Sequence, residues 1–82
     1  MSYVELGQFY MRCKMWTEAI EAHQKEVAIN PKDAEAYAGL GLAYQASGLL
    51  KEAILQFEKA VELVPYRKDL QKLLAEAKEK SH

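Results

Sequence analysis

Apolar residues recur along this chain at helical spacing, in stretches separated by polar or turn-forming residues. Near the start, Tyr3, Leu6, Gly7 and Tyr10 stand three or four positions apart, which places them on one face of an α-helix. Pro31 and Pro65 each close a later stretch, because the residue before a proline is disfavoured in helical geometry. The pattern predicts five helices, over about residues 2–13, 17–29, 34–47, 51–63 and 68–79.

The pattern is also repeated. Residues 3–31 align without a gap with residues 37–65, at an offset of 34, and ten of the 29 pairs are identical. Each unit is therefore predicted to be two antiparallel helices joined by a tight turn. In the tail, Leu70, Leu74 and Ala77 fall at the offset of Ala36, Leu40 and Ala43, whereas the other tail positions are mostly charged or polar. The tail is typical of a helix that caps the end of a helical array.

This 34-residue helix–turn–helix unit resembles the tetratricopeptide repeat. The residues that carry the resemblance in the first unit are Tyr3, Leu6, Gly7, Tyr10, Ala19 and Pro31. In the second unit they are Tyr37, Leu40, Gly41, Tyr44, Gly48, Ala53, Phe57, Ala60 and Pro65. The first unit departs from the pattern at Lys14, His23 and Glu26, which stand opposite Gly48, Phe57 and Ala60.

The expected fold is all-α, with antiparallel helix–turn–helix repeats in a right-handed superhelix. We expect one domain over residues 1–82, divided into repeat 1 (1–33), repeat 2 (34–67) and a capping helix (68–82).

The glycines raise a separate question, because Gly39 and Gly41 stand in a G-x-G arrangement. A dinucleotide-binding loop follows a strand and has a third glycine, but the third position here is Tyr44 and no strand precedes it. Gly7 and Gly41 occupy the same mid-helix place in both units, so we expect them to permit close packing against the second helix of their unit, around Ala19 and Ala53. Gly39 has Glu5 as its counterpart, and we expect it to leave the inner face open. Gly48 suits a left-handed helix end.

Composition narrows the function. The chain has 82 residues, 28 % of them charged, with a formal net charge of −1, so it lacks the basic character expected for nucleic acid or an anionic membrane. The single Cys13 cannot form an internal disulfide and fits a reducing compartment. No apolar run is long enough for a membrane span, and the start does not resemble a signal peptide. We therefore expect a cytoplasmic protein.

Candidates for chemistry are few. A structural zinc site needs four Cys or His ligands, and a cysteine nucleophile needs an adjacent base, so His23, Cys13 and the terminal His82 predict neither a metal site nor an enzyme. We expect no cofactor. His23 is interpreted as a partly buried, hydrogen-bonded packing residue, and Cys13 as unreactive. Glu26 is expected to reach solvent or a cation, with His23 three residues before it as one partner.

The resemblance implies that the first helix of each unit lines a concave surface that receives an extended peptide or a partner helix. The predicted groove residues are Val4, Gln8, Met11, Arg12, Glu35, Ala38, Gly39, Leu42, Gln45, Lys72 and Leu73, with Glu5, Ala46 and Glu76 on the same faces. Family members that grip a carboxylate at a chaperone C-terminus use Lys, Asn and Arg side chains. The matching positions here are Val4, Gln8, Gly39, Asp69 and Leu73, so that clamp is disfavoured.

A second surface follows from the repeat. Ala36, Leu40, Ala43 and Ser47 are expected to pack on the helix before them, but their equivalents in the first unit have no such helix. That predicted oligomer interface consists of Ser2, Leu6, Phe9 and Cys13, and in a homodimer it would be isologous. The sequence thus predicts a non-catalytic protein–protein interaction module. The alternatives are a scaffold unit that homo-oligomerises through this face, or a fragment of a longer array.

Overall fold

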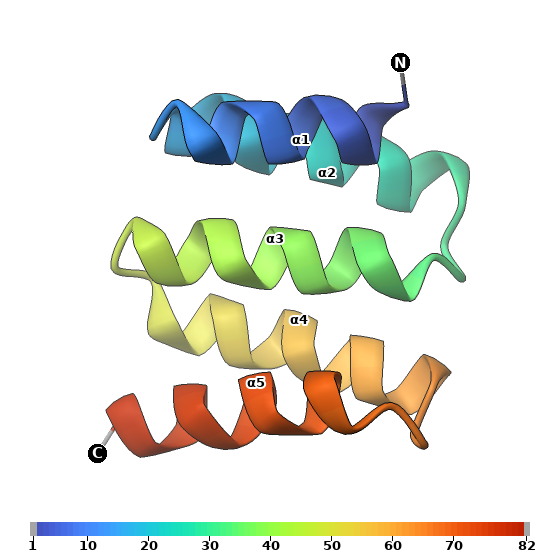
Figure 1. The fold of residues 1–82 in the computed structure, drawn as a ribbon, viewed down its shortest axis with the longest axis vertical. Helices are drawn as coiled ribbons and strands as arrows, with labels where there is room; N and C mark the ends of the chain where they lie inside the picture. Colours follow the sequence, from blue (N-terminus) through green and yellow to red (C-terminus); the bar gives the residue numbers. More distant parts are fainter. Residues whose placement is uncertain (1, 82) are drawn as a thin grey trace.

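The computed structural model describes residues 2–81, which form five α-helices (Figure 1). They are α1 (Tyr3–Arg12), α2 (Trp16–Ile29), α3 (Ala34–Ala46), α4 (Leu50–Leu63) and α5 (Lys68–Lys80). Residues 2–81 contain no strand. The predicted all-α class is therefore confirmed, and each predicted helix lies within one residue of the observed bounds.

Local chemistry sets the helix boundaries. The Ser2 hydroxyl accepts a hydrogen bond from the Glu5 amide at the start of α1, and the Asp33 carboxylate accepts one from the Ala36 amide at the start of α3. After α1 and α3 the chain reverses through a left-handed residue, Lys14 with φ 59° and Gly48 with φ 88°. The two turns thus share one geometry, although only the second has the glycine that suits it.

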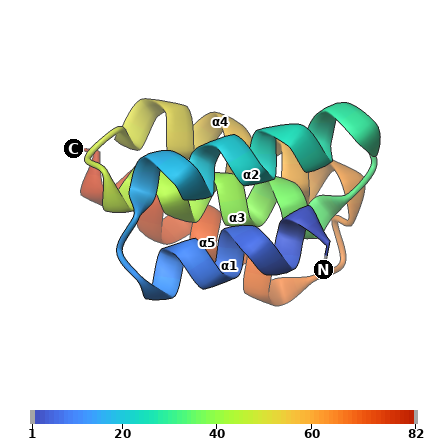
Figure 2. The same cartoon turned by 90° about the horizontal axis from the view of Figure 1, so that it is seen from above.

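The helices pack as two antiparallel hairpins and a final helix. The first hairpin is α1 with α2, the second is α3 with α4, and α5 packs on α4. Figure 2 shows α2 and α4 along one side of the molecule, α1 and α5 along the other, and α3 between them. Helix α3 contacts α1, α2 and α4, so it connects the hairpins. A hydrogen bond of 3.1 Å from the Gln24 side chain to the Tyr44 hydroxyl adds a polar link between α2 and α3.

Small side chains dominate the core and allow close approach of the helices. Ala19, Ala36, Ala43, Ala53 and Ala60 are fully buried. The largest fully buried side chains are Phe57 in α4 and His23 in α2, at equivalent positions of the two hairpins. Each hairpin is therefore centred on one ring.

Both rings pack against a glycine, which explains the repeated mid-helix glycine. A Cβ on Gly41 would stand 2.6 Å from the Phe57 ring, and a Cβ on Gly7 would stand 2.5 Å from the His23 ring. The predicted packing glycines therefore contact the second helix of their own hairpin. The atoms nearest to the two glycines belong to rings one helical turn after the expected Ala19 and Ala53, at His23 and Phe57.

Candidate functional site

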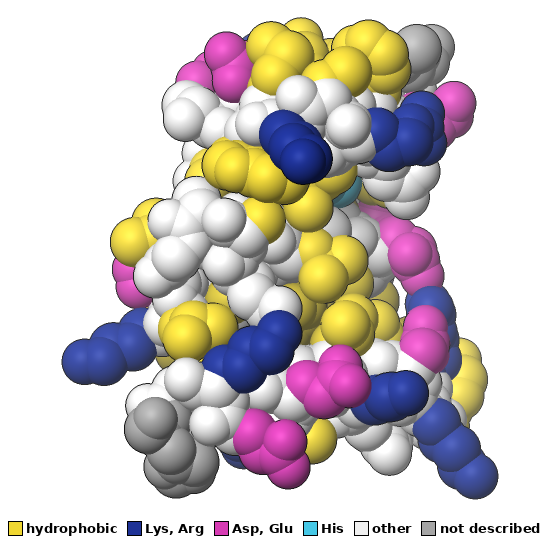
Figure 3. All heavy atoms as spheres, turned by 60° about the vertical axis from the view of Figure 1, so that its left-hand side comes forward, with side chains coloured by type: hydrophobic (Ala, Val, Ile, Leu, Met, Phe, Trp, Pro, Cys, Tyr) yellow, Lys and Arg dark blue, Asp and Glu magenta, His cyan; other side chains and the backbone are white. Residues whose placement is uncertain are grey.

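A groove runs over the inner helices α1, α3 and α5 and contains a cavity of about 400 Å³. From α1 it is lined by Gln8, Met11 and Arg12. From α3 it is lined by Glu35, Ala38, Gly39 and Leu42. Arg67, Asp69, Leu70 and Leu73 line the end near α5, and His23 reaches the cavity from α2. Figure 3 shows hydrophobic side chains gathered in a hollow between the first hairpin and α5, with charged side chains beside it.

Most of the predicted groove residues meet at this cavity. The structure brings together Gln8, Met11, Arg12, Glu35, Ala38, Gly39, Leu42 and Leu73. The lining does not include Val4, Gln45 or Lys72, nor Glu5, Ala46 or Glu76. Leu42 is 36 % exposed, so part of its apolar side chain remains accessible to a ligand. The groove therefore combines an apolar floor with a polar rim.

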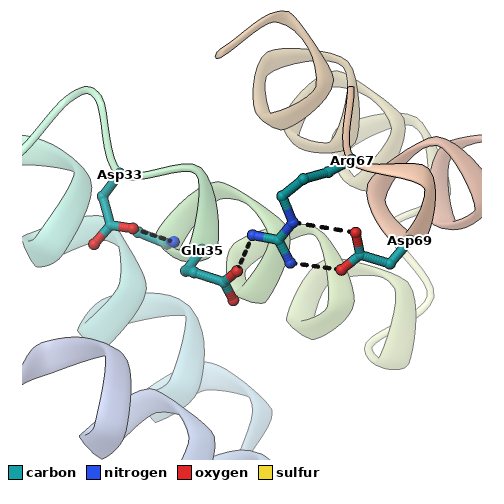
Figure 4. Close-up of polar contacts among 5 residues, drawn as sticks. Asp33, Glu35, Arg67 and Asp69 are labelled. Carbon is teal, nitrogen blue, oxygen red and sulfur yellow. Dashed lines mark hydrogen bonds and ion pairs between the residues drawn. The ribbon is translucent and has the colours of Figure 1, made fainter. Parts of the chain in front are cut away.

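One side of the groove's rim is built around Arg67, which was not among the residues predicted from the sequence. Its guanidinium donates to the Glu35 carboxylate of α3 and to both oxygens of Asp69 in α5, with 3.1 Å from Nε to Oδ1 of Asp69 (Figure 4). The hydrogen bond from Arg67 lowers the pKa of the Asp69 carboxyl, and the two carboxylates raise the pKa of Arg67. In the sequence, Arg67 is marked only by its place in the turn after Pro65, directly before α5.

The deepest lining residue is His23, whose side chain is 0 % exposed. Neither Nδ1 nor Nε2 has a hydrogen-bond partner among residues 2–81. Burial lowers the pKa of His23, and the negative charge of Asp33 partly opposes this. The ring is therefore held in the neutral form, with its hydrogen-bonding capacity unused. The prediction of a partly buried and hydrogen-bonded histidine was wrong on both points, because the Gly7 and Gly39 backbones enclose the ring and offer it no polar partner.

Gly39 lines the cavity and packs directly against His23. In the second hairpin, Leu73 packs against the cluster that contains Phe57. Gly39 stands 34 residues before Leu73 and holds the corresponding place over His23, since a Cβ there would lie 2.4 Å from the imidazole. Gly39 was expected to leave the inner face open. In the structure it lines the cavity and contacts the His23 ring.

Glu26 has a carboxyl group, not a cation, as its neighbour. It is half-buried at the end of α2 that faces the start of α3. Burial raises the pKa of Glu26, and the adjacent Asp33 carboxyl raises it further. Of the two expected surroundings, solvent or a cation, the half-buried Glu26 keeps access to solvent, whereas the cation is replaced by the N-capping Asp33, which the close turn between α2 and α3 brings to this position.

The predicted oligomer face lies on the outside of α1. Phe9 is 45 % exposed, Leu6 is half-buried, and Ser2 and Cys13 are exposed. At the equivalent positions of α3, Ala36, Leu40 and Ala43 are buried as expected, and Leu70 and Ala77 of α5 are also buried. Ser47 differs from its expectation, because it is exposed and its hydroxyl donates to the carbonyls of Ala43 and Tyr44.

Among residues 2–81, no cluster of three or more His, Cys, Asp or Glu residues is arranged to hold a metal ion. None of the described helices has both the length and the apolar character of a membrane span. Residue His82 lies outside the described residues.

Comparison with known proteins agrees with the repeat pattern. The sequence model of the tetratricopeptide repeat matches residues 1–65. A stretch of 49 residues is 39 % identical to superkiller protein 3 of Saccharomyces cerevisiae and covers 60 % of this chain but 3 % of that protein. A stretch of 63 residues is 36 % identical to superkiller protein 3 of Schizosaccharomyces pombe and covers 77 % of this chain but 4 % of that protein. The matched stretch is thus a small part of each relative. Tetratricopeptide repeats are non-catalytic and generally mediate protein–protein interaction, and by its match over residues 1–65 this chain belongs to the tetratricopeptide repeat family.

Proposed function

We propose that this chain is a non-catalytic interaction module that binds an extended peptide or a partner helix in the groove over α1, α3 and α5. The observation that carries the proposal is the cavity of about 400 Å³ with its apolar floor and charged rim. Concave sites of this kind suit a ligand that buries an apolar side chain and directs polar groups towards the edges.

The floor favours an apolar contact. Met11 of α1 and Leu42 of α3 both line the cavity, and the flexible Met11 side chain can adapt to different ligand shapes. At the rim, Arg67 is already engaged by Glu35 and Asp69, so it is not free to hold a ligand carboxylate. This supports an apolar anchor residue over a carboxylate clamp.

A random-peptide phage library selected on the wild-type chain tests the proposal. Selected peptides are then measured against Met11→Ala and Leu42→Ala, with Leu55→Ala as the matched control, since Leu55 is 61 % exposed on α4 and does not line the cavity. We expect Leu42→Ala to weaken binding about tenfold or more, because burying a leucine side chain on binding contributes about 1.5–3 kcal/mol and about 1.4 kcal/mol corresponds to tenfold. Equal loss in Leu55→Ala, or no loss in either groove variant, overturns the proposal.

A second candidate function is self-association through the outer face of α1. The observation that favours it is Phe9, which stands where α3 and α5 have the fully buried alanines Ala43 and Ala77. A preceding helix packed at the same close distance would leave no room for a phenylalanine ring, whereas a second copy could place its own Phe9 and Leu6 against this face. Sedimentation of wild type and Phe9→Glu at high concentration tests this idea. A monomeric wild type excludes it.

A further inference from the structure

The deepest part of the groove combines two departures from the repeat. Where Phe57 is apolar, its counterpart His23 is polar, and where Leu73 covers the Phe57 cluster, its counterpart Gly39 supplies no side chain. A polar ring alone, or a glycine alone, could serve packing within the chain. Together they place an imidazole and a glycine side by side in the lining of the cavity.

That imidazole is available for a further bond. Buried polar groups in folded proteins almost always have hydrogen-bond partners, yet both ring nitrogens of His23 lack one among residues 2–81. The ring lines the cavity from α2, and the glycines at 7 and 39 place no Cβ beside it. A bond to a ligand atom needs a ring nitrogen of His23 to turn towards that cavity, because the side chain is 0 % exposed in this structure.

The surroundings select the chemistry of that ligand atom. A neutral imidazole presents one N–H donor and one acceptor nitrogen, so a hydroxyl, which both donates and accepts, can pair with either. An anionic tip against the ring is disfavoured by Asp33, whose charge acts on the imidazole. The exposed cation Arg12 also lines the cavity, so an acidic residue in the selected peptides is the competing outcome. A cationic tip would have to leave water for the apolar walls formed by Met11, Leu42 and Leu73. The same walls favour a large apolar body behind the hydroxyl.

We propose that His23 is a specificity-determining residue that receives a tyrosine side chain of the bound peptide, with the aromatic ring against the Met11 and Leu42 walls and the hydroxyl hydrogen-bonded to the imidazole. This inference rests on the proposed function, because it names the anchor residue of the ligand for the same groove.

Parallel selections from a random-peptide phage library on wild type and on His23→Phe test the inference. Phenylalanine is the natural replacement, because Phe57 already occupies the equivalent place beside Gly41. We expect tyrosine at one fixed position of the peptides selected by wild type, and phenylalanine or leucine there in peptides selected by His23→Phe. A synthetic Tyr/Phe peptide pair should then differ about tenfold in affinity for wild type and less than about twofold for His23→Phe.

Separate controls distinguish a folding defect of the variant from a loss of tyrosine preference and from a loss of groove binding. The circular dichroism of His23→Phe is compared with that of wild type, and His23→Leu serves as a second variant if the first is unfolded. If peptides compete for the groove but show no tyrosine preference, or prefer an acidic residue, the role of His23 is wrong while groove binding stands. If selected peptides are insensitive to Leu42→Ala, both the inference and the proposed function are overturned.

Discussion

His23 packs so closely against Gly39 that a Cβ on residue 39 would stand 2.4 Å from the imidazole Cε1. This contact joins α2 of the first hairpin to α3 of the second, at the point where the groove is deepest. The absence of a side chain at Gly39 thus permits the close packing of α2 against α3.

Gly39→Ala should destabilise the protein by roughly 1–2 kcal/mol. Overpacking costs about 1–3 kcal/mol, from which the better helix propensity of alanine recovers up to about 1 kcal/mol. In a His23→Ala background the clash is absent, so Gly39→Ala should stabilise the protein. Urea unfolding of wild type, the two single variants and the double variant measures both effects. Identical effects of Gly39→Ala in both backgrounds would show that the ring does not limit residue 39.

Lys14→Gly should stabilise the protein by roughly 0.5–1 kcal/mol. Lys14 has φ 59°, a left-handed conformation that costs an ordinary L-residue about 1–2 kcal/mol and glycine little. The midpoint of thermal unfolding should rise by about 2–8 °C for a chain of this size. The reverse change in the sister turn, Gly48→Lys, serves as the matched control and should lower it. A lower midpoint for Lys14→Gly would contradict the assigned turn geometry.

The free energy of unfolding should depend on pH through His23. Burial lowers its pKa below 6.5 in the folded state, so the unfolded chain binds a proton first as the pH falls. Stability that is present above pH 6.5 is therefore lost progressively below it. Glu26 acts in the opposite direction, since its raised folded pKa makes the native state bind a proton before the unfolded chain does.

Comparison with His23→Phe isolates the histidine contribution. Urea unfolding between pH 7.5 and 5 should show a steeper loss of stability for wild type than for the variant, and Glu26→Gln should make the wild-type loss steeper still. Parallel curves for wild type and His23→Phe would mean that the histidine titrates equally in the folded and unfolded states.

Equivalent positions of α1 and α3 should respond differently to a change in side-chain size. Phe9→Ala should cost less than about 1 kcal/mol, because the ring is 45 % exposed. Ala43→Phe, at the equivalent position of α3, should cost more than about 3 kcal/mol or prevent folding, because Ala43 is fully buried. Thermal unfolding measures both. A large loss for Phe9→Ala at low concentration would show that Phe9 packs within its own chain.

The sequence was sufficient to predict the helices, because apolar periodicity, Pro31, Pro65 and Gly48 mark where each begins and ends. It also predicted that Gly7 and Gly41 permit packing, since the same helix-weakening residue recurs at one register. The residues that fill the space could not be read from spacing, because the His23 and Phe57 rings reach back by one turn to meet the glycines.

The groove was predicted less completely, for reasons that lie in side-chain geometry. Residues on the inner faces of the first helices were predicted from the resemblance to the tetratricopeptide repeat, and most of them line the cavity. Arg67 was missed because its role depends on a turn that brings Glu35 and Asp69 to opposite sides of its guanidinium. His23 was expected to be hydrogen-bonded, and only the packed structure reveals a ring enclosed by two glycine backbones.

Chemical-shift mapping by NMR with a library-selected peptide tests whether the groove over α1, α3 and α5 is the binding site. We expect the largest amide shifts on titration to fall on α1 around Met11 and on α3 from Ala38 to Leu42, together with a change in the His23 ring nitrogens. Shifts centred on the outer face of α1 around Leu6 and Phe9, or on α4 around Leu55, would contradict it.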